Sequence, residues 1–215
     1  MSENSLYDIV RELEIKEFPE LRSNIHHIHR KKGPIDYKYW TPSHHVKTGL
    51  INNEILKDLR GGKKSILSLG CGNAYLERLL VGKLGVSNSQ IELVDQNLRE
   101  IPSGFTVYSF DITKSWPNLK RTYDYIFIPE SFTWFDSLFV RKPFNKKSES
   151  IIALDKLISR SLNVLNDHGQ IRGDGHNLLE SEISFLKERL RDNKVPNQFY
   201  CGDSLIVVRK TGFAR

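Results

Sequence analysis

Two glycines that follow an apolar run are the clearest sign of chemistry in this sequence. Residues 65–69 lead into Gly70-Cys71-Gly72, and a helix-like stretch begins at Tyr75. Glycines let the backbone turn tightly and approach a ligand without a side chain in the way, and a helix beginning offers free N–H groups. A strand, a glycine-rich turn and a helix in this order predict a nucleotide-type site at the carboxyl end of the first strand.

The spacing excludes two familiar phosphate sites, and acids follow the next two strands. A dinucleotide fingerprint needs a third glycine where Tyr75 stands, and a P-loop needs a Gly-Lys-Ser/Thr sequence that does not follow. Asp95 ends a second strand-like run and Asp111 a third. The Asp95 carboxylate offers two acceptor oxygens for the hydroxyls of a ribose. Asp111 offers an acceptor for the exocyclic amine of an adenine.

The elements that must position these residues alternate along the chain after Gly62. Strand-like runs are followed by helical patterns, and the chain closes with a hairpin around Gly202-Asp203. The expected strands are 65–69, 91–94, 105–108, 125–128, 170–172, 199–201 and 204–209, and the expected helices are 75–84, 151–165 and 178–191. The alternation predicts an α/β fold with a doubly wound, seven-stranded, mostly parallel sheet and an antiparallel C-terminal hairpin. Ligands bind such sheets at the carboxyl edge.

The chain before Gly62 is predicted to be helical. The first helix has one buried stripe, formed by Leu6, Ile9, Val10 and Leu13. A further helix begins near Ser43 and ends at Gly61-Gly62. We interpret residues 1–42 as a helical cap over the site and residues 43–215 as the main domain. Residues 129–150 are interpreted as an insertion on the substrate side.

These motifs, in this order, resemble the class I S-adenosylmethionine-dependent methyltransferases over roughly residues 43–209. Residues 67–74 look like the glycine-rich first motif of that family. Residues 123–128 resemble its fourth strand, and 165–169 the turn before its fifth. Two positions depart from the pattern, because Ser68 stands where the family often has an acid and Ala74 where it often has a third glycine. From Ser68 we expect weaker or rearranged binding of the methionine end of the cofactor, or compensation from the N-terminal helices.

The resemblance implies a Rossmann-like domain that binds S-adenosylmethionine and transfers its methyl group by in-line displacement. It also implies a set of cofactor-binding residues at the ends of the first four strands. These residues are Ser68, Leu69, Gly70, Cys71, Gly72, Asn73, Asp95, Gln96, Asp111, Ile112 and Pro129.

The candidate catalytic residues are Glu130 and His176. Glu130 follows the fourth strand and is a candidate general base, although a polar loop residue is an equally simple interpretation. Methyl transfer often needs no base, because positioning supplies much of the rate. His176 follows the fifth strand. The predicted substrate-side residues are aromatic or imidazole groups: Tyr39, Trp40, His44, His45, Phe132 and Trp134. The histidines have no supporting pattern of cysteines or acids, so no metal site is predicted.

Three functions stay open from the sequence. The compact size and the aromatic insertion favour a small-molecule acceptor, aromatic or anionic. The segment 21–64, with ten bases and three acids, and the basic insertion favour an RNA methyltransferase. The fourth strand ends in Pro-Glu-Ser rather than Asn/Asp-Pro-Pro-Tyr/Phe. This ending argues against methylation of the exocyclic amines of nucleobases. Ser68 leaves open a third function, a cofactor-binding module without catalysis.

The overall composition places the chain among ordinary globular proteins. It has 215 residues, a formal net charge of +6 and two cysteines, which is too few for a disulfide framework. The polar N-terminal segment does not look like a secretory signal, and no apolar run approaches the length of a membrane span. We therefore expect a cytoplasmic protein without a membrane partner. The sequence makes no prediction of oligomeric state.

Overall fold

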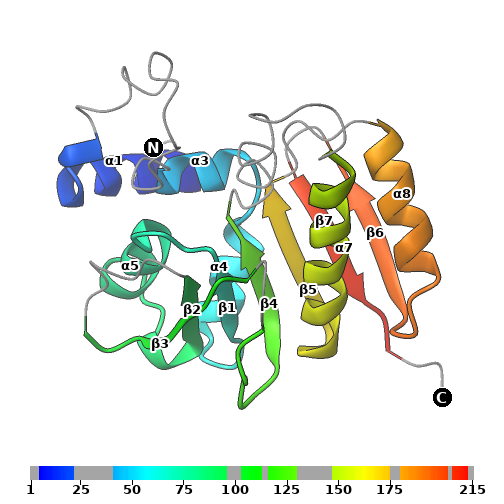
Figure 1. Cartoon of the computed structure of the whole chain (residues 1–215). Helices are drawn as coiled ribbons and strands as arrows, with labels where there is room; N and C mark the ends of the chain where they lie inside the picture. Colours follow the sequence, from blue (N-terminus) through cyan, green and yellow to red (C-terminus); the bar gives the residue numbers. More distant parts are fainter. Residues whose placement is uncertain are drawn as a thin grey trace.

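The fold of this chain is built around a single sheet. The structure is a computed structural model that describes residues 5–21, 41–95, 103–112, 116–129, 147–174, 180–202 and 205–212. The described strands form a seven-stranded sheet in the order β3-β2-β1-β4-β5-β7-β6 (Figure 1). Their bounds are β1 Ile66–Leu69, β2 Ile91–Asp95, β3 Thr106–Ser109, β4 Tyr123–Ile128, β5 Leu165–Asp174, β6 Asn197–Cys201 and β7 Leu205–Lys210. Neighbouring strands among β1 to β5 pair in parallel, whereas β7 pairs antiparallel with both β5 and β6. The predicted doubly wound sheet with an antiparallel C-terminal hairpin is confirmed.

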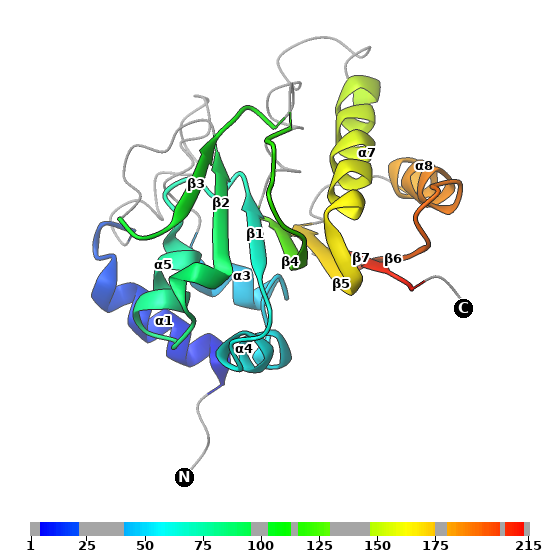
Figure 2. The same cartoon turned by 90° about the horizontal axis from the view of Figure 1, so that it is seen from below.

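Helices cover both faces of this sheet. Figure 2 shows α1 (Leu6–Glu17), α3 (Pro42–Lys47), α4 (Asn53–Arg60) and α5 (Tyr75–Gly82) on one face, and α7 (Lys147–Asn163) and α8 (Glu180–Arg191) on the other. Each face has its own apolar core, and the two cores take alternate residues of the central strands. The strands β1 and β4 are buried along their whole length, as expected for parallel strands covered on both sides. The strand β3, at one edge of the sheet, is mostly exposed.

The strand order places one edge of the sheet in the position expected of a binding site. The chain moves outward from β1 through β2 to β3 and then returns to β4 on the other side of β1. The order therefore reverses between β1 and β4. In open α/β sheets, ligands bind outside the carboxyl ends of the strands at such a reversal. The glycine-rich turn after β1 lies at this point.

The predicted helix from Ser43 to Gly61 is wrong, because the structure has two helices there. Gly49, with φ +83°, separates α3 from α4, and Asn52 caps α4 by accepting the Ile55 N–H at 3.0 Å. The first of them, α3, is capped by Thr41, whose side chain accepts the backbone N–H of His44 at 3.3 Å. Helix propensity did not reveal this break, because the break depends on the left-handed backbone of Gly49 in the connection.

The predicted buried stripe of the first helix is also partly wrong. Ile9 is 39% exposed, whereas Leu6 and Val10 are buried and Leu13 is half-buried. The buried face includes an acid instead, because Glu14 accepts the backbone N–H of Ser43 at 2.8 Å. This bond ties α1 to the beginning of α3.

Two boundaries further along the chain also differ from the expectations. The strand β5 begins at Leu165, so the residues 165–169 that resembled a turn lie within it. Its pairing with β4 shifts register between Tyr123 and Tyr125, and His168 nearby has a left-handed φ of 65°. The helix α7 begins at Lys147, so the last four residues of the predicted insertion 129–150 are helical. The division at residue 42 stays a prediction.

Candidate functional site at the carboxyl edge of the sheet

The turn after β1 alternates between ordinary and left-handed backbone. Gly70, Gly72 and Ala74 have φ values of 72°, 57° and 52°. The turn is closed by two backbone bonds, from the Gly70 N–H to the Val94 carbonyl at 2.7 Å and from the Ala74 N–H to the Cys71 carbonyl at 2.8 Å. Left-handed backbone is cheap for glycine and costs about 1–2 kcal/mol for other residues. Ala74 is thus a strained alanine. It stands where the family that this chain resembles often has glycine.

Asp95 joins this turn to the second strand. It ends β2, is half-buried, and its Oδ2 accepts the backbone N–H of Gly72 at 2.9 Å. The sequence spacing suggested an acid for ribose hydroxyls, and the structure adds a role for it in holding the turn. The contact with a ribose stays a prediction.

The other described cofactor-binding candidates lie around the same edge. Asp111 follows β3 by two residues and is half-buried, and Pro129 follows β4 directly. Leu69 and Ile112 are buried in the apolar core on the α7 face, so their side chains pack there. Asn73 donates from its amide to the Tyr75 hydroxyl at 3.3 Å. The structure thus brings the ends of the first four strands together, as predicted from their order.

Ser68 does not stand alone, because a buried acid lies beside it. Its hydroxyl donates to Oε1 of Glu77 at 2.5 Å, and both side chains are buried. Glu77 belongs to the first turn of α5. Burial raises the pKa of Glu77, although the hydrogen bond from Ser68 opposes the rise. Sequence reasoning missed Glu77. The available signal was an acid on a helix whose residues three and four positions further on, Leu80 and Val81, are apolar.

The thiol between the two glycines is affected by the same carboxylates. Burial raises the pKa of Cys71 well above its ordinary value, and the charges of Glu77 and Asp95 raise it further. The raised pKa keeps Cys71 a neutral thiol near neutral pH.

The helix α3 brings two predicted substrate residues toward this edge. Arg172, near the carboxyl end of β5, donates to the carbonyls of Gly49 at 2.5 Å and Leu50 at 3.1 Å, just after α3. His45 is buried on α3 and His44 half-buried, with their ring centroids 6.1 Å apart. Their contact with a substrate stays a prediction. The remaining candidates lie outside the described residues: Tyr39, Trp40, Gln96, Glu130, Phe132, Trp134 and His176.

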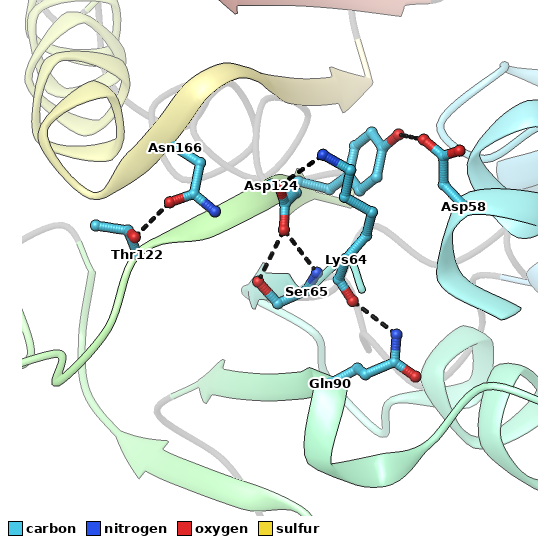
Figure 3. Close-up of polar contacts among 8 residues, drawn as sticks. Asp58, Lys64, Ser65, Gln90, Thr122, Asp124 and Asn166 are labelled. Atoms are coloured by element: carbon cyan, nitrogen blue, oxygen red, sulfur yellow. Dashed lines mark hydrogen bonds and ion pairs between the residues drawn. The ribbon is translucent and has the colours of Figure 1, made fainter. Parts of the chain in front are cut away.

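The basic pair before β1 lies at the opposite edge of the sheet. Figure 3 shows Lys64 and Ser65 meeting Asp124 at the beginnings of β1 and β4. The Lys64 ammonium forms an ion pair with Asp124 at 3.0 Å. Lys64 is therefore held by a partner within the fold, at the edge opposite to the candidate site.

Two kinds of feature are absent from the part of the chain that the structure describes. No cluster of three or more His, Cys, Asp or Glu side chains is placed there to hold a metal ion. The described helices are also all too short or too polar to span a bilayer. The histidines 26, 27 and 29 lie outside the described residues.

The sheet order, the antiparallel β7 and the glycine-rich turn after β1 give this chain the α/β fold of the class I methyltransferases. No model of a known family matches the sequence, and no curated protein sequence matches it.

Several solved structures have a similar fold. One is the N-methyltransferase NodS of Bradyrhizobium japonicum in complex with S-adenosyl-L-homocysteine, at 14% identity over 91% of this chain and 98% of that one, with a TM-score of 0.49. A second is CalS10, an amino pentose methyltransferase from Micromonospora echinaspora, at 10% identity over 78% and 91% of the two chains, with a TM-score of 0.48. A third is the magnesium protoporphyrin IX methyltransferase of Synechocystis, at 11% identity over 98% and 100%, with a TM-score of 0.44. The likeness concerns the chain fold, and their acceptors differ.

Proposed function

We propose that this protein binds S-adenosylmethionine at the turn after β1 and transfers its methyl group to a small-molecule acceptor. The observation that carries the proposal is the hydrogen bond from the Gly72 N–H to Asp95 at 2.9 Å. It unites a glycine-rich backbone turn with an acceptor of ribose hydroxyls at the reversal point of the sheet. A nucleoside whose ribose carries an extended group, as in S-adenosylmethionine, fits a glycine-rich turn beside such an acceptor.

The residues of the chain have separate tasks in this proposal. The turn from Gly70 to Gly72 lies against the cofactor, Asp95 accepts from the ribose, and Asp111 accepts from the adenine amine. When bound, the cofactor supplies an electrophilic methyl group on a sulfonium, whose carbon–sulfur bond breaks as the bond to the acceptor forms. The cap, together with His44 and His45 of the main domain, orients the acceptor, and orientation supplies much of the rate. Glu130 and His176 stay the predicted groups for taking a proton from the acceptor.

A small molecule is favoured as the acceptor because two of the described bases near the amino edge have partners within the fold. Lys64 is paired with Asp124, and the Arg60 side chain donates to the Leu84 carbonyl at 2.6 Å. Two of the ten bases in residues 21–64 thus hold the fold together. The helix α3 has two adjacent imidazoles, His44 and His45, which suit a small polar or aromatic acceptor.

Calorimetric titration with S-adenosylmethionine and S-adenosylhomocysteine tests the proposal. We expect micromolar binding to the wild type and a loss of about 30-fold or more in Asp95→Ala. The variant loses both the bond that holds Gly72 and the ribose acceptor, and each hydrogen bond to a charged group contributes about 1.5–3 kcal/mol. Asp167→Ala is the matched control, because Asp167 is exposed near the beginning of β5 and pairs with Lys210 at 3.3 Å. The control should bind as the wild type does.

The outcomes separate an enzyme from a cofactor-binding module. No binding to the wild type, or equal binding to Asp95→Ala, would contradict the proposal. Binding together with methylated product from a panel of small acceptors supports an enzyme. Binding without turnover on either small molecules or RNA would favour a cofactor-binding module.

A further inference from the structure

One buried carboxylate beside the glycine-rich turn lacks the kind of partner that other buried acids have. Glu77 is 2% exposed, and its side chain accepts a hydrogen bond from Ser68 at 2.5 Å. Within the described residues, no Lys, Arg or His forms an ion pair with it. A neutral hydroxyl offsets only part of the cost of burying a carboxylate.

The other buried acids show what is usual in this chain. Glu92, Asp124 and Asp155 each form an ion pair with an arginine or a lysine. Glu14 accepts the backbone N–H of Ser43, in the first turn of α3, where the helix dipole favours an anion. Glu77 therefore stands apart as a buried acid whose described partners, the Ser68 hydroxyl and its own backbone N–H, are both uncharged.

The position of Glu77 directs its negative charge at the turn. It lies in the first turn of α5, and helical side chains lean toward the N-terminus of their helix. Ser68 is on β1, immediately before the turn, and the charge of Glu77 acts on the thiol of Cys71 inside it. Asp95 holds the same turn from the side of β2. Two carboxylates thus flank a backbone turn that we propose to bind a nucleoside.

We propose that Glu77, held by Ser68, is a specificity-determining residue that makes this site prefer a ligand with a cationic amine. This inference rests on the proposed function and identifies the amine as the ammonium of the amino-acid part of the cofactor. Direct contact is not required, because attraction between a carboxylate and a cation extends over several ångströms in a site of low dielectric constant. The ligand supplies the positive charge that the described protein groups do not.

Two ligands that differ in the amino-acid part test this inference. S-adenosylhomocysteine has the ammonium, the carboxylate beside it and an uncharged sulfur, and 5′-methylthioadenosine has the same nucleoside without the amino-acid part. We expect Glu77→Gln to weaken binding of S-adenosylhomocysteine about tenfold or more, which corresponds to about 1.4 kcal/mol. Binding of 5′-methylthioadenosine should change less than about twofold. Glutamine still accepts the bond from Ser68, so the substitution removes the charge and preserves the hydrogen bond.

The controls distinguish the charge of Glu77 from a general effect of losing a buried acid. Asp155→Asn removes another buried carboxylate, on α7, and should leave the ratio of the two affinities unchanged. The double variant Ser68→Asp with Glu77→Gln moves a carboxylate to the neighbouring strand position and should restore the preference. If Glu77→Gln does not fold, the comparison of this double variant with Ser68→Asn/Glu77→Gln answers the same question.

Each remaining outcome has a definite meaning. An equal change for both ligands, or no change for either, overturns the inference and leaves the proposed function standing. Failure of the wild type to bind either ligand overturns the proposed function and this inference with it. A selective loss for the ligand that has the ammonium supports both.

Discussion

Asp124 connects the beginnings of two neighbouring strands. Its Oδ1 accepts from the Lys64 ammonium at 3.0 Å, and its Oδ2 from the Ser65 backbone N–H at 3.0 Å (Figure 3). Burial disfavours the charged form of this carboxyl, but the hydrogen bonds from Lys64 and Ser65 outweigh it and lower the pKa of Asp124. The carboxylate therefore stabilises the pairing of β1 with β4 as long as it stays ionised.

We expect Asp124→Asn to lower the free energy of unfolding by about 2 kcal/mol at neutral pH. The difference from the wild type should narrow as the pH falls below about 4, because a depressed pKa in the folded state contributes stability that is lost in acid. Urea unfolding at neutral pH and at about pH 3 measures both values.

Asp192→Asn is the control for this prediction. Asp192 is exposed and pairs with Arg191 at 3.3 Å, so its substitution should change the free energy of unfolding by less than about 0.5 kcal/mol. An Asp124→Asn effect that is the same at both pH values would contradict the electrostatic explanation.

At the scale of elements, Arg172 connects the sheet to the N-terminal helices. Its guanidinium donates to two carbonyls in the connection between α3 and α4, those of Gly49 and Leu50. Arg172 is buried, and burial lowers the pKa of its guanidinium from the ordinary value. The planar fork of an arginine reaches two acceptors at once, which a lysine does not. Arg172 thus fixes α3, with His44 and His45, beside the carboxyl edge.

We expect Arg172→Lys to destabilise the protein by about 1–3 kcal/mol, because one buried carbonyl loses its donor. Amide hydrogen exchange across residues 42–60 should become faster, since the connection loses its attachment to β5. Arg209→Lys, an exposed substitution on the neighbouring strand β7, is the control and should leave exchange unchanged. Unchanged exchange in Arg172→Lys would show that packing alone holds α3.

At the scale of the whole molecule, the net charge of +6 raises the question whether the protein binds RNA as its acceptor. The charge is uneven, because residues 1–20 have six acids and two bases and residues 21–64 are basic. A protein that contacts several phosphates loses affinity steeply with salt, because each contact releases counterions. The proposed small-molecule acceptor predicts no such dependence.

We therefore expect weak RNA binding with a shallow dependence on salt, measured by fluorescence anisotropy between about 50 and 200 mM salt. Heparin at the same charge concentration is the control, because it separates general attraction of anions from recognition of RNA. A steep slope for RNA together with weak binding of heparin would contradict a small-molecule acceptor and favour RNA methylation.

Local patterns in the sequence were sufficient to predict much of the fold. Alternation of strands and helices, the glycines at 70 and 72, and the acids at 95 and 111 predicted the fold and the edge that holds the candidate site. These features are local because the backbone conformation of a glycine and the period of an apolar pattern depend on neighbouring residues. The break between α3 and α4 was missed, because Gly49 ends a helix through a left-handed backbone.

The contacts that define the site were decided by the tertiary structure. The bond from Gly72 to Asp95, the pairing of Ser68 with Glu77 and the reach of Arg172 to Gly49 join different elements. Such contacts depend on strand register and on the way in which helices pack on the sheet, and one residue of slippage would turn each side chain to the other face. The sequence could place acids at strand ends, but only the packing of α5 on β1 decided that a buried Glu77 stands beside Ser68.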